Sequence, residues 1–253
     1  MTTLAAAPAA RAFWYLTRGT GVAALVMLTT SVVLGILTSL RWSAPRWPRF
    51  VIEGLHRSVS LCVVIFLGLH IATAVLDGFA PISWLDAVIP FRSPYRPVWL
   101  GLGAVAFDLL VAVILTSLFR VRLGYRVWRF VHWMAYACWP VALLHGLGTG
   151  TDTQRVWMLA LDAAAVIAVV LAVWTRIAEA PPEAATARAI AGVASVVVPL
   201  AMCAWAFVGP LRQGWARTAG TPTSLLKPKT ANGRALRPAT AAVATTSTGG
   251  GQR

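Results

Sequence analysis

The chain has 253 residues, of which 58% are hydrophobic and only 12% are charged, and its net charge is +14. Soluble domains carry about 25% charged residues, so the composition argues against a soluble globular enzyme. The basic residues lie between long apolar runs, which is typical of membrane loops rather than of a nucleic-acid groove. Cys62, Cys138 and Cys203 lie inside apolar runs without a CxxC pair, so they indicate no disulfide framework and no zinc or iron–sulfur site.

Six stretches approach the roughly 20 apolar residues that a helix needs to cross the hydrocarbon core of a bilayer. Helices are expected because backbone groups in lipid must bond within their own segment, and no alternating pattern of barrel strands is present. We therefore predict an all-α integral membrane protein with a six-transmembrane-helix bundle, whose spans are 19–40, 57–76, 98–119, 127–147, 156–174 and 190–208.

These spans divide the chain into three parts. Residues 1–18 are a short N-terminal segment, residues 19–209 are the transmembrane domain, and residues 210–253 are a basic tail rich in Ala, Thr and Pro. The tail has almost no large apolar residue after Leu226, so we expect it to be disordered. Docking of its basic residues on anionic lipid headgroups is the alternative.

The distribution of arginine predicts the orientation. The second and fourth loops hold only Arg92, Arg96 and Arg155. The first, third and fifth loops hold ten basic residues, namely Arg41, Arg46, Arg49, Arg57, Arg120, Arg122, Arg126, Arg129, Arg176 and Arg188. Basic loops face the cytoplasm, so both termini are expected outside the plasma (inner) membrane. Seven Lys and Arg from Arg212 onward oppose this orientation, but most lie far from the last span, where they weigh less.

All four histidines fall on the second and fourth spans. His56 and His70 lie in "VIEGLHRSVSLCVVIFLGLHIATAVL", and His132 and His145 lie in "WRFVHWMAYACWPVALLHG". Ionisable groups are costly in a bilayer and normally face a partner or a pathway, so ligation is favoured over simple packing. Zinc needs ligands around one point, and these histidines are too far apart along their helices for that.

The spacing sets the expected geometry. Fourteen residues separate His56 from His70, which is about 21 Å of helical rise and about 40° short of whole turns. Thirteen residues separate His132 from His145, which is about 19.5 Å with an angular mismatch of about 140°. Pro140 lies between these two, and we expect a proline kink to relieve the mismatch.

One span separates the two histidine-bearing spans, so they should run parallel. Parallel helices bring His56 level with His132, and His70 level with His145. Two opposed imidazoles are the axial ligands of a low-spin haem, so each level could hold one haem and the two together could carry electrons across the bilayer.

This pattern resembles the ferric reductase-like transmembrane family, which includes the membrane parts of NADPH oxidases and metalloreductases. "LHRSVSLCVVIFLGLH" and "WRFVHWMAYACWPVALLHGLGTGTD" look like its two haem helices. "WYLTRGTGVAALVMLTTSVVLG" and "LGLGAVAFDLLVAVILTSLFR" look like helices that accompany them in bacterial members, and the resemblance covers roughly residues 13–175. It implies two b-type haems with axial ligands His56, His70, His132 and His145.

The resemblance also implies what this chain lacks. Oxidases and many reductases of the family continue into a flavin and nicotinamide domain, whereas a further apolar span and a tail follow here, without a GxGxxG or a P-loop. We therefore expect no FAD or NAD(P) site in this chain, which would be an electron-transfer subunit. The donor would be a cytoplasmic flavoprotein or membrane quinol. The acceptor would be an extracytoplasmic ferric chelate or a flavin or redox protein, and a quinol-fed subunit of a periplasmic methionine sulfoxide reductase system is the closest variant.

Several other residues are candidates for the site. Arg57, Arg126 and Arg129 flank the cytoplasmic histidines, and we expect a haem propionate to find a partner among them. For any single one of them, a positive-inside loop is the better explanation. Asp108 lies inside the third span and could accept a hydrogen bond from a ligand histidine, or bond a neighbouring helix instead. The connector "DGFAPISWLDAVIPFRSPYRP" is expected to lie at the interface or to form a lid over the outer haem.

Two other classes of function stay open from the sequence. A membrane transporter or sensor could use intramembrane histidines for protons or metal ions, but transporters often show repeats with broken helices at the midplane, which are not apparent here. A purely structural membrane scaffold would leave the matched histidines unexplained.

Overall fold

The computed structural model describes residues 6–42, 44 and 47–226, and the described chain is almost entirely helical. Its long helices are α1 (Ala6–Ser39), α2 (Arg49–Leu76), α3 (Pro97–Leu118), α6 (Met134–Thr149), α7 (Val156–Ala178) and α8 (Ala185–Val208). Shorter ones are η1 (Trp84–Ala87), α4 (Arg120–Leu123), α5 (Tyr125–His132), η2 (Pro182–Ala184), α9 (Trp215–Thr218) and α10 (Thr223–Leu226).

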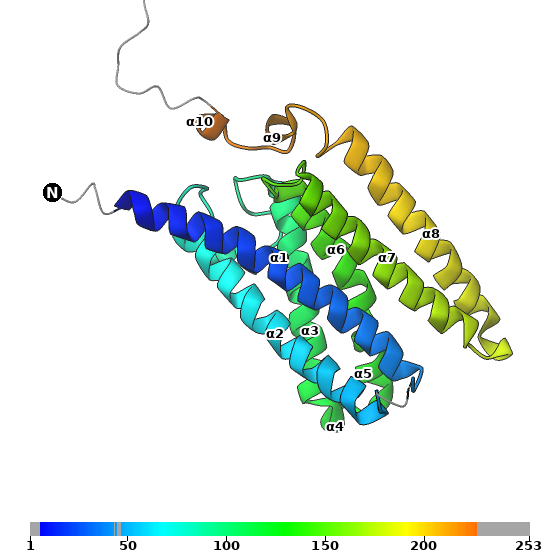
Figure 1. The fold of residues 1–253 in the computed structure, drawn as a ribbon. Coiled ribbons are helices and arrows are strands. Elements are labelled where there is room, and N and C mark those ends of the chain that lie inside the picture. Colours follow the sequence, from blue (N-terminus) through cyan, green and yellow to red (C-terminus); the bar gives the residue numbers. More distant parts are fainter. Residues whose placement is uncertain (1–5, 43, 45–46, 227–253) are drawn as a thin grey trace, which may run out of the picture.

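The long helices form a bundle whose axes run roughly side by side (Figure 1). α1 packs along α2, α3 packs along α6, and α7 packs between α1 and α8, which lies at the edge. We call the end that holds the start of α1 together with α9 and α10 the upper end, and the end that holds α4 and α5 the lower end, as they lie in Figure 1. α2 and α6 both run from the lower end to the upper end, so the predicted parallel direction of the two histidine-bearing helices is confirmed.

Five helical segments are long and apolar enough to cross a membrane. They are Ala12–Ser39, Arg49–Leu76, Pro97–Leu118, Val156–Ala178 and Pro182–Val208. Large apolar side chains such as Leu61, Ile190 and Phe207 are exposed on the outside of these helices, as expected where lipid rather than water surrounds the bundle. The all-helical membrane prediction is therefore confirmed.

The fourth predicted span, 127–147, differs from the expectation because it is divided into α5 and α6. The expected count of six continuous spans therefore becomes five, plus this pair of shorter helices. The break follows His132 directly: the Trp133 amide bonds the carbonyls of both Arg129 and Phe130, and the Tyr136 amide bonds the Trp133 carbonyl three residues back.

The break is not centred on Pro140, which lies inside α6. Bonds between residues three apart belong to the tighter 3₁₀ winding, which turns by about 120° per residue instead of about 100°. At ordinary α-helical winding, the angle between His132 and His145 falls short of four whole turns. Tighter winding increases this angle, so the turn at Trp133 brings the two side chains closer to one face of the helix.

The two ends of the chain also differ from the predicted boundaries. α1 begins at Ala6 rather than at residue 19. The tail expected from residue 210 is ordered as far as Leu226, because Trp215 packs against Trp99 and Trp205 and its indole nitrogen donates to the Gly148 carbonyl at 3.0 Å. The remainder of the predicted tail, 227–253, lies outside the described residues.

A buried arginine fixes this C-terminal segment to the bundle. The Arg96 guanidinium donates to the carbonyls of Gly148 and Thr149 at the end of α6 and to the Thr221 hydroxyl. Its backbone amide donates to the Gly220 carbonyl at 3.1 Å. A buried charge is tolerated when hydrogen bonds satisfy it, and here those bonds also occupy carbonyls that a helix end leaves open.

Replacement of Trp215 tests this attachment. Trp215→Ala removes a half-buried indole and its hydrogen bond, and we expect the segment to open more easily by about 2 kcal/mol, or about 30-fold. Cleavage by trypsin after the exposed Arg212 and Arg217, followed by mass spectrometry, measures this opening. Trp157→Ala, which removes an exposed indole at the start of α7, is the control, and equal cleavage of both variants would contradict the packing described.

Candidate functional site

The structure brings the four histidines together in the two expected pairs. The ring centres of His56 and His132 are 6.4 Å apart, and their planes are inclined at 76°. The ring centres of His70 and His145 are 6.3 Å apart, with planes inclined at 83°. The first pair joins α2 to α5 near the lower end, and the second joins α2 to α6 near the upper end.

These separations are too long for a hydrogen bond between the rings and suit a metal between them. The atoms of a five-membered ring with C–N bonds of about 1.33 Å lie about 1.1 Å from its centre. A metal–imidazole bond is about 2.0–2.1 Å long, so two imidazoles on opposite sides of one metal ion have centres about 6.4 Å apart. Both pairs match this distance.

The Nδ1 atoms of three histidines are hydrogen-bonded to backbone carbonyls of a neighbouring helix. His56 bonds the Ser31 carbonyl at 3.0 Å, His70 bonds the Thr17 carbonyl at 2.8 Å, and His145 bonds the Trp99 carbonyl at 2.9 Å. A carbonyl only accepts, so Nδ1 must carry the proton and Nε2 is the free, unprotonated nitrogen. This is the usual second contact of a metal-bound histidine, which orients the ring and raises its basicity.

The fourth histidine is different. Nδ1 of His132 is buried and has no hydrogen-bond partner among the described residues. Its ring instead stacks on the indole of Trp128, with ring centres 5.0 Å apart and planes inclined at 29°. Trp128 is held in turn by a 3.2 Å hydrogen bond from its indole nitrogen to the Ser117 hydroxyl.

A glycine lies beside each of the three hydrogen-bonded rings. A Cβ atom on Gly103 would lie 2.5 Å from Nδ1 of His145, one on Gly21 would lie 2.9 Å from Nδ1 of His70, and one on Gly35 would lie 3.2 Å from Cε1 of His56. Each glycine follows its acceptor carbonyl by four residues, Thr17 to Gly21, Ser31 to Gly35 and Trp99 to Gly103. The missing side chain therefore opens the helix surface at the carbonyl that the imidazole must reach.

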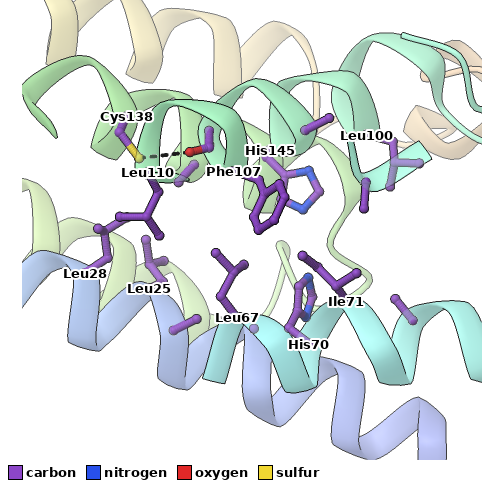
Figure 2. A pocket seen from close by; sticks show the side chains of 18 of the residues that line it. Leu25, Leu28, Leu67, His70, Ile71, Leu100, Phe107, Leu110, Cys138 and His145 are labelled. Carbon is purple, nitrogen blue, oxygen red and sulfur yellow. Dashed lines mark hydrogen bonds between the residues drawn. The ribbon is translucent and has the colours of Figure 1, made fainter. Parts of the chain in front are cut away.

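A hollow surrounds the upper pair, and Figure 2 shows His70 and His145 on its opposite walls. Its lining is mostly apolar and comes from α1, α2, α3 and α6, with Leu25, Leu67, Leu100 and Phe107 among the larger side chains. Ile82, Asp86 and Ala87 of the connector between α2 and α3 also line it. The connector thus borders the hollow, as the lid hypothesis requires.

The remaining predicted site residues lie further from the rings. Arg57, Arg126 and Arg129 are exposed at the lower end, and the Arg129 guanidinium lies over the Trp133 ring, 5.6 Å from its centre. Asp108 is partly buried on α3, but it is not a hydrogen-bond partner of any of the four histidines. Backbone carbonyls make the histidine contacts that one of the two interpretations assigned to its carboxylate.

The carbonyls and glycines are the functional groups that sequence reasoning missed. Gly21 and Gly35 are fourteen residues apart on α1, which is the spacing of His56 and His70 on the antiparallel α2. This shared spacing was the available signal. In residues 6–42, 44 and 47–226, no three His, Cys, Asp or Glu side chains gather as a multi-ligand metal site requires, so each pair is an arrangement of two ligands.

Comparison with known proteins agrees with this geometry. Residues 20–143 match the family model described as "Ferric reductase like transmembrane component". The match covers just under half of the chain, includes His56, His70 and His132, and ends two residues before His145. No curated protein and no solved structure matches the chain. The segment from residue 20 to residue 143, which holds three of the four paired histidines, is thus similar to the ferric reductase-like transmembrane family.

Proposed function

We propose that this protein carries electrons across a membrane as a di-haem b-type cytochrome. The observation that supports the proposal is the pair of opposed imidazole rings at each of two levels, 6.4 Å and 6.3 Å between centres. A bound haem would supply one-electron chemistry. His56 and His132 would hold one haem, and His70 and His145 the other.

The residues of this chain bind and orient rather than react. His56, His70 and His145 present Nε2, because the carbonyls of Ser31, Thr17 and Trp99 hold their rings through Nδ1. The apolar lining around the upper pair excludes water, which disfavours competing chemistry at the site. Arg57, Arg126 and Arg129 are the candidates for propionate contacts at the lower end, where a guanidinium can bind a carboxylate with two parallel hydrogen bonds.

The direction of transfer follows from the proposed orientation. The lower end carries Arg41, Arg49, Arg57, Arg120, Arg122, Arg126, Arg129, Arg176 and Arg188, which favours a cytoplasmic location for it. The His56–His132 site would then receive electrons from a cytoplasmic flavoprotein or a membrane quinol. The His70–His145 site would deliver them to a ferric chelate or to a flavin or redox protein outside, such as a periplasmic methionine sulfoxide reductase.

The haem content of the purified protein tests the proposal. We expect a red protein with a b-type spectrum after dithionite reduction and about two haems per chain in the pyridine haemochrome assay. His70→Leu and His145→Leu should each remove one haem and leave the other. A correctly inserted but colourless protein would instead favour the transporter or sensor, and loss of both haems in every histidine variant would contradict the pairing.

A glycine substitution tests the close approach of helix and ring. Gly103→Ala puts a methyl group 2.5 Å from Nδ1 of His145, so we expect the chain to lose most of the haem at the upper site and keep that at the lower one. Gly146→Ala is the matched control, because Gly146 adjoins His145 in α6 and a Cβ there meets nothing within 4 Å. If both variants retain two haems, the glycine is not required for ligation.

The inclination of the rings predicts a spectroscopic signature. Ring planes at 76° and 83° make π donation to the iron nearly equal along two directions. Near-equal donation leaves two iron d orbitals almost degenerate, which gives a strongly anisotropic low-spin ferric signal in electron paramagnetic resonance. We expect two such signals from the oxidised protein, whereas ordinary rhombic signals would indicate nearly parallel rings.

A further inference from the structure

Each of the three hydrogen-bonded histidines contacts a carbonyl that is followed, four residues later, by a glycine. This combination recurs on the two neighbouring helices, α1 and α3. On α1 the acceptor carbonyls Thr17 and Ser31 are fourteen residues apart, as are the glycines Gly21 and Gly35 that follow them. On α3 only the first member is present, namely the Trp99 carbonyl followed by Gly103. Fourteen residues further along α3, the corresponding positions are Val113 and Ser117.

Ser117 stands where the repeat would place a fourth glycine, and it lies at the level of His132. Its hydroxyl donates to the Val113 carbonyl at 2.7 Å, which occupies the acceptor that the repeat would offer to His132. The same hydroxyl accepts the indole N–H of Trp128 at 3.2 Å, and Trp128 stacks on the His132 ring. Ser117 therefore makes the shorter of two side-chain hydrogen bonds to this carbonyl, the other coming from the Thr116 hydroxyl at 3.2 Å, and it also holds the Trp128 ring beside His132.

We propose that Ser117, acting through Trp128, is a positioning residue that withholds the Nδ1 hydrogen bond from His132 and so raises the midpoint potential of the His56–His132 haem. This inference rests on the proposed haem function. A hydrogen bond from Nδ1–H to a carbonyl makes an imidazole a stronger electron donor, and a stronger donor stabilises ferric over ferrous iron. His132 is the ligand whose Nδ1 lacks this bond among the described residues.

The site depends on stacking to orient the ring instead. Trp128 is four residues before His132 on α5, so the two side chains lie on the same face of that helix. The ring centres are 5.0 Å apart, within the range in which aromatic rings attract each other. Stacking fixes the plane of the His132 ring without placing partial negative charge at Nδ1. It therefore orients the imidazole but does not raise its basicity.

Substitution of Ser117 tests the inference on the full-length, haem-loaded protein. Ser117→Gly removes the Cβ and the 2.7 Å hydrogen bond to the Val113 carbonyl, and it leaves the longer 3.2 Å bond from the Thr116 hydroxyl. The Thr17 carbonyl binds His70 while it accepts a similar 3.3 Å bond from Thr20, so Nδ1 of His132 gains an acceptor. At a fixed ambient potential we expect the ferric-to-ferrous ratio of one haem to rise about tenfold, which is a fall of about 59 mV in its midpoint potential. Spectroelectrochemical titration measures the midpoint potentials of both haems in one sample, and the potential of the second haem should not change.

Two further variants make the comparison specific. Ser117→Ala removes the hydroxyl but keeps the Cβ, so it should not lower the potential. Trp128→Gln places an amide oxygen on the face of α5 where the indole contacts His132, and it should lower the potential as Ser117→Gly does. Trp128→Gln tests the same inference if Ser117→Gly does not retain its haem.

The haem whose midpoint potential shifts should be the one that persists in His70→Leu.

The outcomes separate this inference from the proposed function. If the protein carries no haem, the proposed function fails. If the protein carries two haems but their midpoint potentials are equal in Ser117→Gly and Ser117→Ala, the role of Ser117 is refuted and the di-haem function stands. The same conclusion holds if the potential that shifts belongs to the haem that is lost in His70→Leu.

Discussion

The arrangement of the site depends on one interaction, the hydrogen bond from a histidine Nδ1 to a backbone carbonyl of the neighbouring helix. A helical carbonyl already accepts an amide within its own helix, but it has a second lone pair to offer. An imidazole can reach that lone pair only where the helix surface is open, and Gly21, Gly35 and Gly103 provide the openings. The direction of each ring is thus set by how closely α1 approaches α2 and α3 approaches α6.

A backbone acceptor also suits the low dielectric of a membrane. A carboxylate beside a ligand histidine would strengthen its donation further, but an ionised carboxylate inside the bilayer is costly. The carbonyls of Thr17, Ser31 and Trp99 orient neutral imidazoles without adding charge. The absence of Asp108 from the histidine contacts is understandable on this ground, since a neutral dipole does the orienting.

The sequence predicts those parts of the structure that follow from hydrophobic length and histidine spacing. Long apolar runs gave the helices, and the parallel direction of the second and fourth spans gave the pairing of His56 with His132 and of His70 with His145, which the ring distances match. The division of the fourth span at Trp133 was not predictable from Pro140, because the break consists of tight backbone hydrogen bonds around Trp133, whereas Pro140 lies inside α6.

Contacts between distant segments account for the other differences. The segment from Leu211 to Leu226 has the composition of a tail, and its order depends on Arg96 and on the indole cluster of Trp99, Trp205 and Trp215. No local sequence pattern in this segment predicts these contacts. The glycines beside the rings were visible in the sequence, but their role emerges only when α1 is laid antiparallel to α2 and the two fourteen-residue spacings coincide.

The most direct test of the central claim is a cryo-EM map of the purified protein in lipid nanodiscs. We expect a planar group with central iron between His56 and His132, and another between His70 and His145, each iron bonded to two Nε2 atoms. A map that shows the histidine rings in direct contact, or turned toward the lipid with nothing bound between them, would contradict the di-haem site.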